Sequence, residues 1–297
     1  MKRRSYGRDL GLTLRMLLTT GLLGLLYVVF AVILFQVLDA SILVMVVIIG
    51  GLAFFQYFTS DKIALATSGA KVVSPEQAPE LHAMVERLCA LADLPKPRVA
   101  VIPTDMPNAF ATGRSPKHSA VAVTEGLWRR LEPHEVEGVI AHELSHIGNR
   151  DVLVMTLASF FAMLAGLLTR VGMFGGMMGG GRRDNSGGAP VWLIVLLVSI
   201  LTYVLSFILI RTISRYREYA ADRGAALITG APENLMSALQ KISSGIAQIP
   251  QRDLRQAEAL NAFFIVPSVS ELFATHPPME KRLARLAQIA REMGRPV

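Results

Sequence analysis

Four long apolar stretches interrupt an otherwise polar chain. The stretches 16–35, 40–60 and 189–210 carry no charged residue and are long enough to cross a bilayer as helices, whereas 152–169 is uncharged but shorter. The pattern therefore predicts four transmembrane helices. For the last two stretches a second interpretation stays open, in which they pack as buried helices of a globular domain.

Shorter patterns between the second and third stretches predict both helices and strands. Ser74-Pro75-Glu76 begins a predicted helix with an apolar stripe. Residues 97–103 and 120–124 predict short strands, and the stretch 105–119 between them is rich in turn residues. Pro133 then opens another helix. Together these patterns predict an α+β domain.

The region after the fourth stretch predicts two helices, 211–229 and 232–246, separated by a Gly-Ala-Pro turn. The Gly- and Met-rich segment 170–188, between the third and fourth stretches, predicts a flexible loop. Neither polar region, 61–151 or 211–297, has the pattern of a complete domain, so we expect the two regions to fold together.

Composition agrees with a membrane protein, because 52% of the residues are hydrophobic and the mean hydropathy is +0.43. The net charge of +7 lies near the ends of the apolar stretches and in the C-terminal helix, where anionic lipid headgroups of the bilayer would meet it. We expect no nucleic-acid partner, because no aromatic and basic pattern accompanies the charge. The single cysteine, Cys89, excludes an intramolecular disulfide and a cysteine-based zinc site.

Positive charge predicts the orientation of the spans. Four basic residues within 1–8 precede the first span, no small-x-small cleavage site follows it, and Lys62 and Lys71 follow the second span. Four arginines between 211 and 223 follow the last span. Only Arg182 and Arg183, between the third and fourth spans, count against a topology of four spans with both termini inside. The positive-inside rule then places both polar regions in the cytoplasm. We expect a multi-pass membrane protein.

The motif H-E-x-x-H occurs at His142-Glu143-Leu144-Ser145-His146, inside the helix that Pro133 opens. Two histidines four residues apart project from one helical face, so both imidazoles can bind one metal ion. Glu143 lies beside them, placed to take a proton from the attacking water. The motif predicts a zinc peptidase with one Zn²⁺ per chain; the alternative is an accidental histidine pair on an amphipathic helix.

A catalytic zinc needs a third protein ligand. The metzincin pattern fails, because Val152 occupies the position of its last histidine. Glu218 is a candidate, and Asp222 lies one turn further on the same face, where it could accept a hydrogen bond from a ligating imidazole. These carboxylates among arginines could instead form a solvated face with ion pairs. His276 competes weakly as a ligand.

Five motifs occur in the order seen in HtpX-type membrane zinc metalloproteases, and the resemblance covers nearly the whole chain. It implies that His142, His146 and Glu218 bind zinc, with Glu143 as general base and Asp222 as the partner of a ligand. The motifs are Asn108-Ala109-Phe110-Ala111-Thr112-Gly113, Thr124-Glu125-Gly126-Leu127, His142 to His146 with Asn149-Arg150-Asp151, Arg217 to Asp222, and Thr275-His276-Pro277-Pro278.

Two further roles concern the substrate. Asn108, Ala109 and Phe110 resemble the substrate-binding edge of that family, where an extended peptide adds as a strand. A plain turn between strands is the alternative. His276, held before two prolines, could donate to the oxyanion of the tetrahedral intermediate, or could be a surface histidine in a turn.

We therefore expect a mainly α integral membrane protein with an α+β zincin-like catalytic domain. The predicted parts are a membrane hairpin at 1–60, the first part of the catalytic domain at 61–151, a second membrane pair at 152–210 and the second part of the catalytic domain at 211–297. The expected function is cleavage of membrane or misfolded, unfolded polypeptides at the cytoplasmic membrane surface. The resemblance implies a role in protein quality control under stress and a location in the bacterial cytoplasmic (inner) membrane.

Two alternatives remain. One is a related protease that processes prenylated C-termini, which would be expected to have many more spans. The other is a zinc-binding scaffold or a transporter without catalysis. A scaffold has no need of Glu143, and transport is disfavoured because the apolar stretches lack internal charges and broken-helix signals.

Overall fold

The computed structural model describes residues 10–38, 42–178, 191–247 and 277–295. The chain divides into two compact units, which are described separately. A helical unit consists of Leu10–Phe58 and Val154–Ile213. A mixed unit, which contains helices and a β-sheet, includes Thr59–Leu153 and Ser214–Val297.

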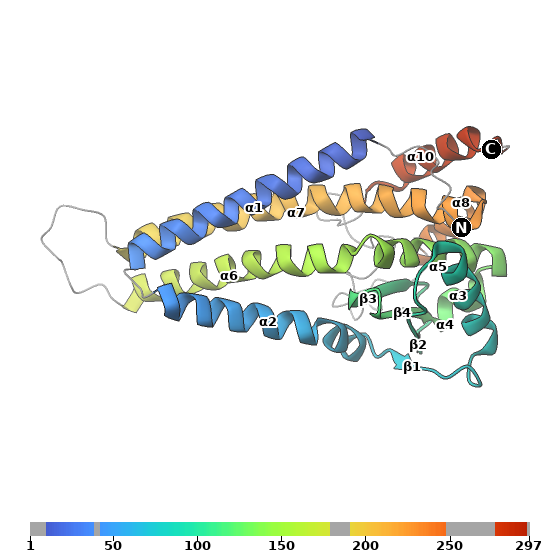
Figure 1. The fold of residues 1–297 in the computed structure, drawn as a ribbon, viewed down its shortest axis with the longest axis horizontal. Helices are drawn as coiled ribbons and strands as arrows, with labels where there is room; N and C mark the ends of the chain where they lie inside the picture. The colour runs from blue at the N-terminus through green and yellow to red at the C-terminus, as the bar shows by residue number, and fades with distance from the viewer. Residues whose placement is uncertain (1–9, 39–41, 179–190, 248–276, 296–297) are drawn as a thin grey trace, which may run out of the picture. The chain divides into compact units, whose positions relative to one another are not determined.

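Long apolar helices build the helical unit, as the uninterrupted hydrophobic stretches predict. Tyr27 donates a hydrogen bond to the carbonyl oxygen of Ala158 (2.7 Å) and stacks on Phe161. These contacts join the first and third helices of the unit. The helices are α1 (Leu10–Leu38), α2 (Ile42–Thr67), α6 (Asp151–Met178) and α7 (Val191–Thr229), which Figure 1 labels. By sequence, one end of each of α2, α6 and α7 belongs to the mixed unit.

By length and composition, two of the described helices can cross a membrane: Gly11–Gln36 within α1, and α7. Residues 42–60 of the second predicted span and all of 152–169 lie in helices, but the four-span topology stays a prediction. Large apolar side chains are exposed on these helices, which is rare on a soluble surface and suits hydrocarbon. Examples are Leu17, Phe54 and Leu201.

Helix α6 extends further than the sequence pattern indicates. The loop prediction for 170–188 is wrong at its start, because the helix continues to Met178. The segment up to that residue contains no proline, so nothing removes a backbone hydrogen bond from the helix. Residues 179–190 lie outside the described part of the chain.

A four-stranded sheet in the order β1-β2-β4-β3 forms the centre of the mixed unit. Strand β4 pairs parallel with β2 and antiparallel with β3. Val121 and Val123 of β4 pack into the core on the helix side of the sheet, and Ala120 and Ala122 pack with Leu65 on the other side. The strands are β1 (Lys71–Val72), β2 (Arg98–Ile102), β3 (Ala109–Ser115) and β4 (His118–Thr124).

Strand β3 lies inside the stretch 105–119, for which the sequence predicts turns, so that prediction is wrong there. Its backbone pairs with β4 from Ala109 opposite Val123 to Gly113 opposite Ser119. Pairing with a buried neighbouring strand therefore overrides the turn-forming residues. As the last strand in the sheet order, β3 has one edge that faces away from β4.

Five further helices complete the described part of the mixed unit. The first begins at Pro79 rather than at Ser74, because proline suits the first helical turn, and the preceding residues form a turn in which the Ser74 amide donates to the Gln77 side chain. The helices are α3 (Pro79–Ala92), α4 (Glu125–Arg130), α5 (Pro133–Gly148), α8 (Pro232–Ala247) and α10 (Met279–Glu292).

Helix α5 is held firmly at its start. Glu132 and Glu135 form a capping box, and the buried Glu135 also binds Lys241 of α8 (2.9 Å). At Gly138 the two helices touch, because an added Cβ atom would lie 2.9 Å from the backbone nitrogen of Leu235. The glycine in this helix therefore permits close packing.

Candidate metal centre

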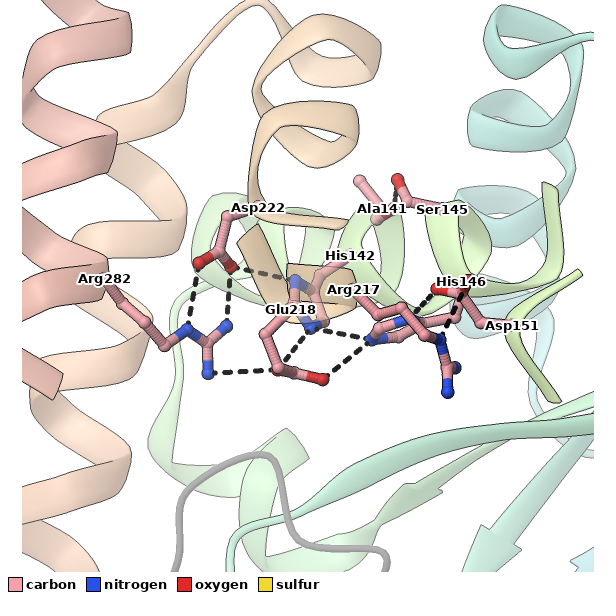
Figure 2. Close-up of polar contacts among 9 residues, drawn as sticks. All are labelled: Ala141, His142, Ser145, His146, Asp151, Arg217, Glu218, Asp222 and Arg282. Carbon is pink, nitrogen blue, oxygen red and sulfur yellow. Dashed lines mark hydrogen bonds and ion pairs between the residues drawn. The ribbon is translucent and has the colours of Figure 1, made fainter. Parts of the chain in front are cut away.

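Three donor atoms from two helices converge at one point (Figure 2). His142 and His146 lie one turn apart on α5, and Glu218 lies on α7. Nε2 of His142 is 3.2 Å from Nε2 of His146 and 3.4 Å from one Glu218 oxygen. Nε2 of His146 is 3.3 Å from the other oxygen.

These separations suit zinc. Ligand atoms held at about 2.0–2.2 Å from a tetrahedral Zn²⁺ lie about 3.3–3.6 Å from each other. Two imidazole nitrogens and one carboxylate are also a common donor set of catalytic zinc, which leaves one position open. The three residues therefore fit the predicted ion in number, chemistry and spacing.

The other nitrogen of His142 faces a buried carboxylate. Nδ1 of His142 lies 3.0 Å from Asp222, one turn beyond Glu218 on α7. Arg282 of α10 binds both oxygens of Asp222, at 2.6 and 3.0 Å, and its Nη1 lies 3.5 Å from Glu218. A carboxylate at Nδ1 fixes the tautomer that leaves Nε2 available to a metal.

His146 has an equivalent partner that the sequence pattern did not assign. Its Nδ1 hydrogen bonds to Asp151 at 2.7 Å, and Asp151 forms an ion pair with Arg217 at 2.9 Å. Nδ1 of each imidazole thus faces an aspartate, and each aspartate pairs in turn with an arginine. The motif Asn149-Arg150-Asp151 was the available signal, although nothing in it shows where Asp151 points.

A sharp turn between α5 and α6 brings Asp151 back to His146. Helix α5 ends at Gly148, Arg150 has a φ of +57°, and α6 begins at Asp151. The helix of the zinc motif therefore does not continue without interruption through Ile147 to Asp151. A left-handed residue other than glycine costs about 1–2 kcal/mol, so the surrounding contacts must hold this turn in place.

The crossing of α5 and α7 depends on a second glycine. A Cβ atom added at Gly224 would lie 2.4 Å from Oγ of Ser145. This hydroxyl donates to the carbonyl oxygen of Ala141 at 2.8 Å, so it has a fixed direction. The close approach lets carboxylates on α7 reach imidazoles on α5.

Charge balance also indicates a divalent cation. Four carboxylates are buried around the donors, and two guanidinium groups are buried with them. When all of these groups are ionised and both imidazoles are neutral, as metal ligands must be, the cluster carries two uncompensated negative charges, and buried charge is costly unless it is neutralised. The carboxylates belong to Glu143, Asp151, Glu218 and Asp222, and the guanidinium groups to Arg217 and Arg282.

Glu143 lies beside the donors but is not one of them. Burial raises the pKa of its carboxyl above the usual value, while the imidazoles of His142 and His146 and a backbone hydrogen bond from Ala111 lower it. A carboxyl whose pKa is raised is a better match to a proton transfer near neutral pH. Burial alone would lower the pKa of His146, but hydrogen bonds to Asp151 and Glu218 raise it to about 10.

The predicted substrate edge lies at the start of β3. Ala109 and Phe110 are the first residues of the strand, and Asn108 precedes it, with its backbone amide bonded to Oγ1 of Thr124 at 2.9 Å. The backbone of Ala111, one residue beyond the predicted set, donates a hydrogen bond to the carboxylate of Glu143. His276 lies outside the described residues.

Comparison with known proteins decides the family. Residues 75–290 match the model of peptidase family M48. The chain belongs to this family. It is 54% identical over 300 residues to "Protease HtpX homolog" of Moorella thermoacetica, covering 98% of each chain, and 50% identical to "Protease HtpX homolog 1" of Streptomyces coelicolor, covering 97% of this chain and 96% of that protein.

These matches confirm the resemblance to HtpX-type proteases. As a member of peptidase family M48, the protein is a metallopeptidase. Among solved structures it resembles the crystal structure of Ste24p from S. mikatae, with a TM-score of 0.52 and 20% identity. The match covers 89% of this chain and 62% of that one, so this chain spans less than two thirds of that protein. At this identity the likeness shows the fold alone.

Proposed function

We propose that this M48 metallopeptidase is a membrane-anchored zinc endopeptidase that cleaves membrane or unfolded proteins at the cytoplasmic membrane surface, in protein quality control under stress. The observation that carries the proposal is the convergence of His142, His146 and Glu218 beside the buried Glu143. This is the donor set and the base that a zinc peptidase needs.

When bound, Zn²⁺ polarises the scissile carbonyl and lowers the pKa of the attacking water towards about 7. Glu143 takes the proton from that water and later delivers it to the leaving amine. Asp222 and Asp151 hold the two imidazoles in the orientation that presents Nε2. His276 stays a predicted oxyanion donor.

The outer edge of β3 is the proposed site for the substrate backbone. An extended peptide can add there as a further strand, with main-chain hydrogen bonds to the residues from Asn108 onward. Ala111 marks where such a strand passes the general base. Because only an extended segment can pair in this way, loops, tails and unfolded chains are better substrates than folded domains.

We also propose that 61–151 and 211–297 are two parts of one catalytic domain, with membrane parts at 1–60 and 152–210. Contacts from both sequence segments support this division, since Asp151 pairs with Arg217 and His142 with Asp222. The positive charges that flank the apolar helices support a cytoplasmic location of the catalytic domain. The membrane that holds the helices is, in this proposal, a bacterial inner membrane.

Cysteine labelling tests this orientation. In intact cells, Asn185→Cys should react with a membrane-impermeant maleimide, and Ser270→Cys should react only after permeabilisation. The native Cys89 is buried and its thiol pKa is raised by burial to about 11, so it should give little background. Labelling of position 270 from outside would contradict the proposed topology.

Zinc content and proteolysis together test the proposed activity. Purified full-length protein in detergent should contain about one zinc per chain and digest casein. A chelator should remove both the metal and the activity, and added Zn²⁺ should restore them, because the ion supplies the polarisation of the carbonyl and of the attacking water. Protein that holds zinc but cleaves no polypeptide would favour the scaffold alternative.

A further inference from the structure

The C-terminal helix α10 buries a charged side chain on its apolar face. The buried residues of this helix are Arg282, Leu286, Ile289 and Ala290, so a guanidinium takes the first position of a stripe that is otherwise apolar. Leu286 packs in the same core as Leu239 of α8, and the side chain of Arg282 is only 1% exposed. Arginine is almost never buried so fully unless it is paired, because burying its charge is costly.

The partner of this guanidinium is the carboxylate that faces His142 (Figure 2). Arg282 donates to both oxygens of Asp222, from Nε at 3.0 Å and from Nη2 at 2.6 Å. The oxygen that accepts from Nη2 is also the one that lies 3.0 Å from Nδ1 of His142. A bidentate guanidinium adds geometric specificity to the ion pair, so it holds the carboxylate in one orientation.

His142 lies between two carboxylates of α7. Its Nε2 is 3.4 Å from Glu218, and its Nδ1 is 3.0 Å from Asp222. Nε2 can bind a metal only while the proton of the neutral imidazole stays on Nδ1, which requires a fixed acceptor there. Arg282 hydrogen bonds to that acceptor, whereas its Nη1 lies 3.5 Å from Glu218, beyond the usual length of a hydrogen bond.

We propose that Arg282 is a positioning residue of the peptidase, through which helix α10 completes the metal centre. The guanidinium fixes Asp222, and Asp222 holds the imidazole of His142 with Nε2 directed at the other two donors. This inference rests on the proposed function, because it requires a metal at the three donors. Stability alone does not account for the pair, since replacing a buried ion pair by apolar side chains is often neutral or stabilising.

Metal affinity tests the proposal in the full-length protein in detergent. Arg282→Gln keeps a long polar side chain but loses the charged fork. The zinc dissociation constant, measured by chelator competition, should rise about 10- to 100-fold, as expected when a ligating imidazole loses its support. The visible absorption bands of Co²⁺ bound in place of zinc should also change, because they depend on the coordination geometry. A purely structural role would lower the melting temperature and leave both quantities unchanged in the folded protein.

Arg282→Lys separates charge from geometry. Lysine keeps the positive charge as a single point and cannot bind both oxygens of Asp222 as a fork. We expect its zinc affinity to be nearer to that of Arg282→Gln than to that of the wild type. If Arg282→Lys has the affinity and the cobalt spectrum of the wild type, charge alone is sufficient and the positioning role is wrong.

The variant Asp222→Asn and the double variant Asp222→Asn/Arg282→Gln test whether the guanidinium acts through Asp222. In that case both substitutions break one interaction, and the double variant should bind zinc no more weakly than the weaker of the two single variants. Losses that multiply in the double variant would show that Arg282 acts independently of Asp222, which overturns the proposal. The double variant leaves neither charge of the pair buried alone. If Arg282→Gln does not fold, the same comparison is therefore made between Asp222→Asn and the double variant.

Two matched controls remove a positive charge elsewhere in the contact between α10 and α7. Arg285→Gln removes the guanidinium that lies 4.9 Å over the ring of Tyr219, and Arg223→Gln removes an ion pair with Glu292 at 3.7 Å. Both variants should keep the zinc affinity and the cobalt spectrum of the wild type. If the wild type itself binds neither Zn²⁺ nor Co²⁺, the proposed function is wrong. If it binds both ions and Arg282→Gln binds them equally well, only the role of Arg282 is wrong.

Discussion

Glu143→Gln is expected to abolish casein cleavage while zinc stays bound. The amide keeps the size of the side chain, and Glu143 is not one of the three converging donors, so metal binding should be unaffected. The amide cannot accept the proton of the attacking water, and the loss of a general base costs about 100- to 10,000-fold in rate. Initial rates of casein digestion and zinc analysis of the same sample measure both quantities.

A matched control lies on the same helix. Glu137→Gln makes the same chemical change at a partly exposed position of α5, where Glu137 pairs with Arg87 at the surface. This variant should keep the wild-type rate. If Glu143→Gln retains more than a few per cent of wild-type activity, Glu143 is not the general base.

The local part of the site is predictable from sequence because helix geometry alone determines it. Residues four apart on a helix lie on one face, which places His142 above His146 and Glu218 above Asp222. A glycine inside a helix can mark a close neighbour, and at Gly138 of α5 the backbone of α8 lies there. These predictions need no knowledge of the tertiary fold.

The contacts that complete the site are not local, and sequence patterns miss them for that reason. Arg282 binds Asp222 across 60 residues, yet in sequence it belongs to a charged amphipathic helix that looks solvated. Asp151 reaches His146 only because the chain turns at Arg150. In the same way β3 pairs with β4 although turn-forming residues such as Gly113 and Ser115 lie within it.

The two arginines explain how so many carboxylates can be buried together. Without Arg217 and Arg282, the carboxylates that orient the imidazoles would compete with each other for the metal and would repel Glu143. Each arginine neutralises one aspartate, and Arg282 also lies 3.5 Å from Glu218. The ion pairs thus separate orienting carboxylates from the ligand and the base.

Glu218→Ala is expected to lose most of the bound zinc and, with it, the activity. The substitution removes one of three converging donors, and two imidazoles alone leave the ion with too few protein ligands for a stable site. Zinc content should fall below about a tenth of the wild-type value after dialysis. Metal analysis, with a thermal melt to verify folding, provides the measurement.

Variants around Glu218 separate a lost ligand from a lost orientation. Asp151→Asn should keep zinc but bind it about 10- to 100-fold more weakly in chelator competition, because the residue holds His146 without touching the ion. His276→Ala should keep the metal and lose about 100-fold in rate, as expected for one oxyanion donor. If His276→Ala instead loses the zinc and Glu218→Ala retains it, the third ligand is His276. The convergence of Glu218 with the two histidines would then be a feature of charge balance alone.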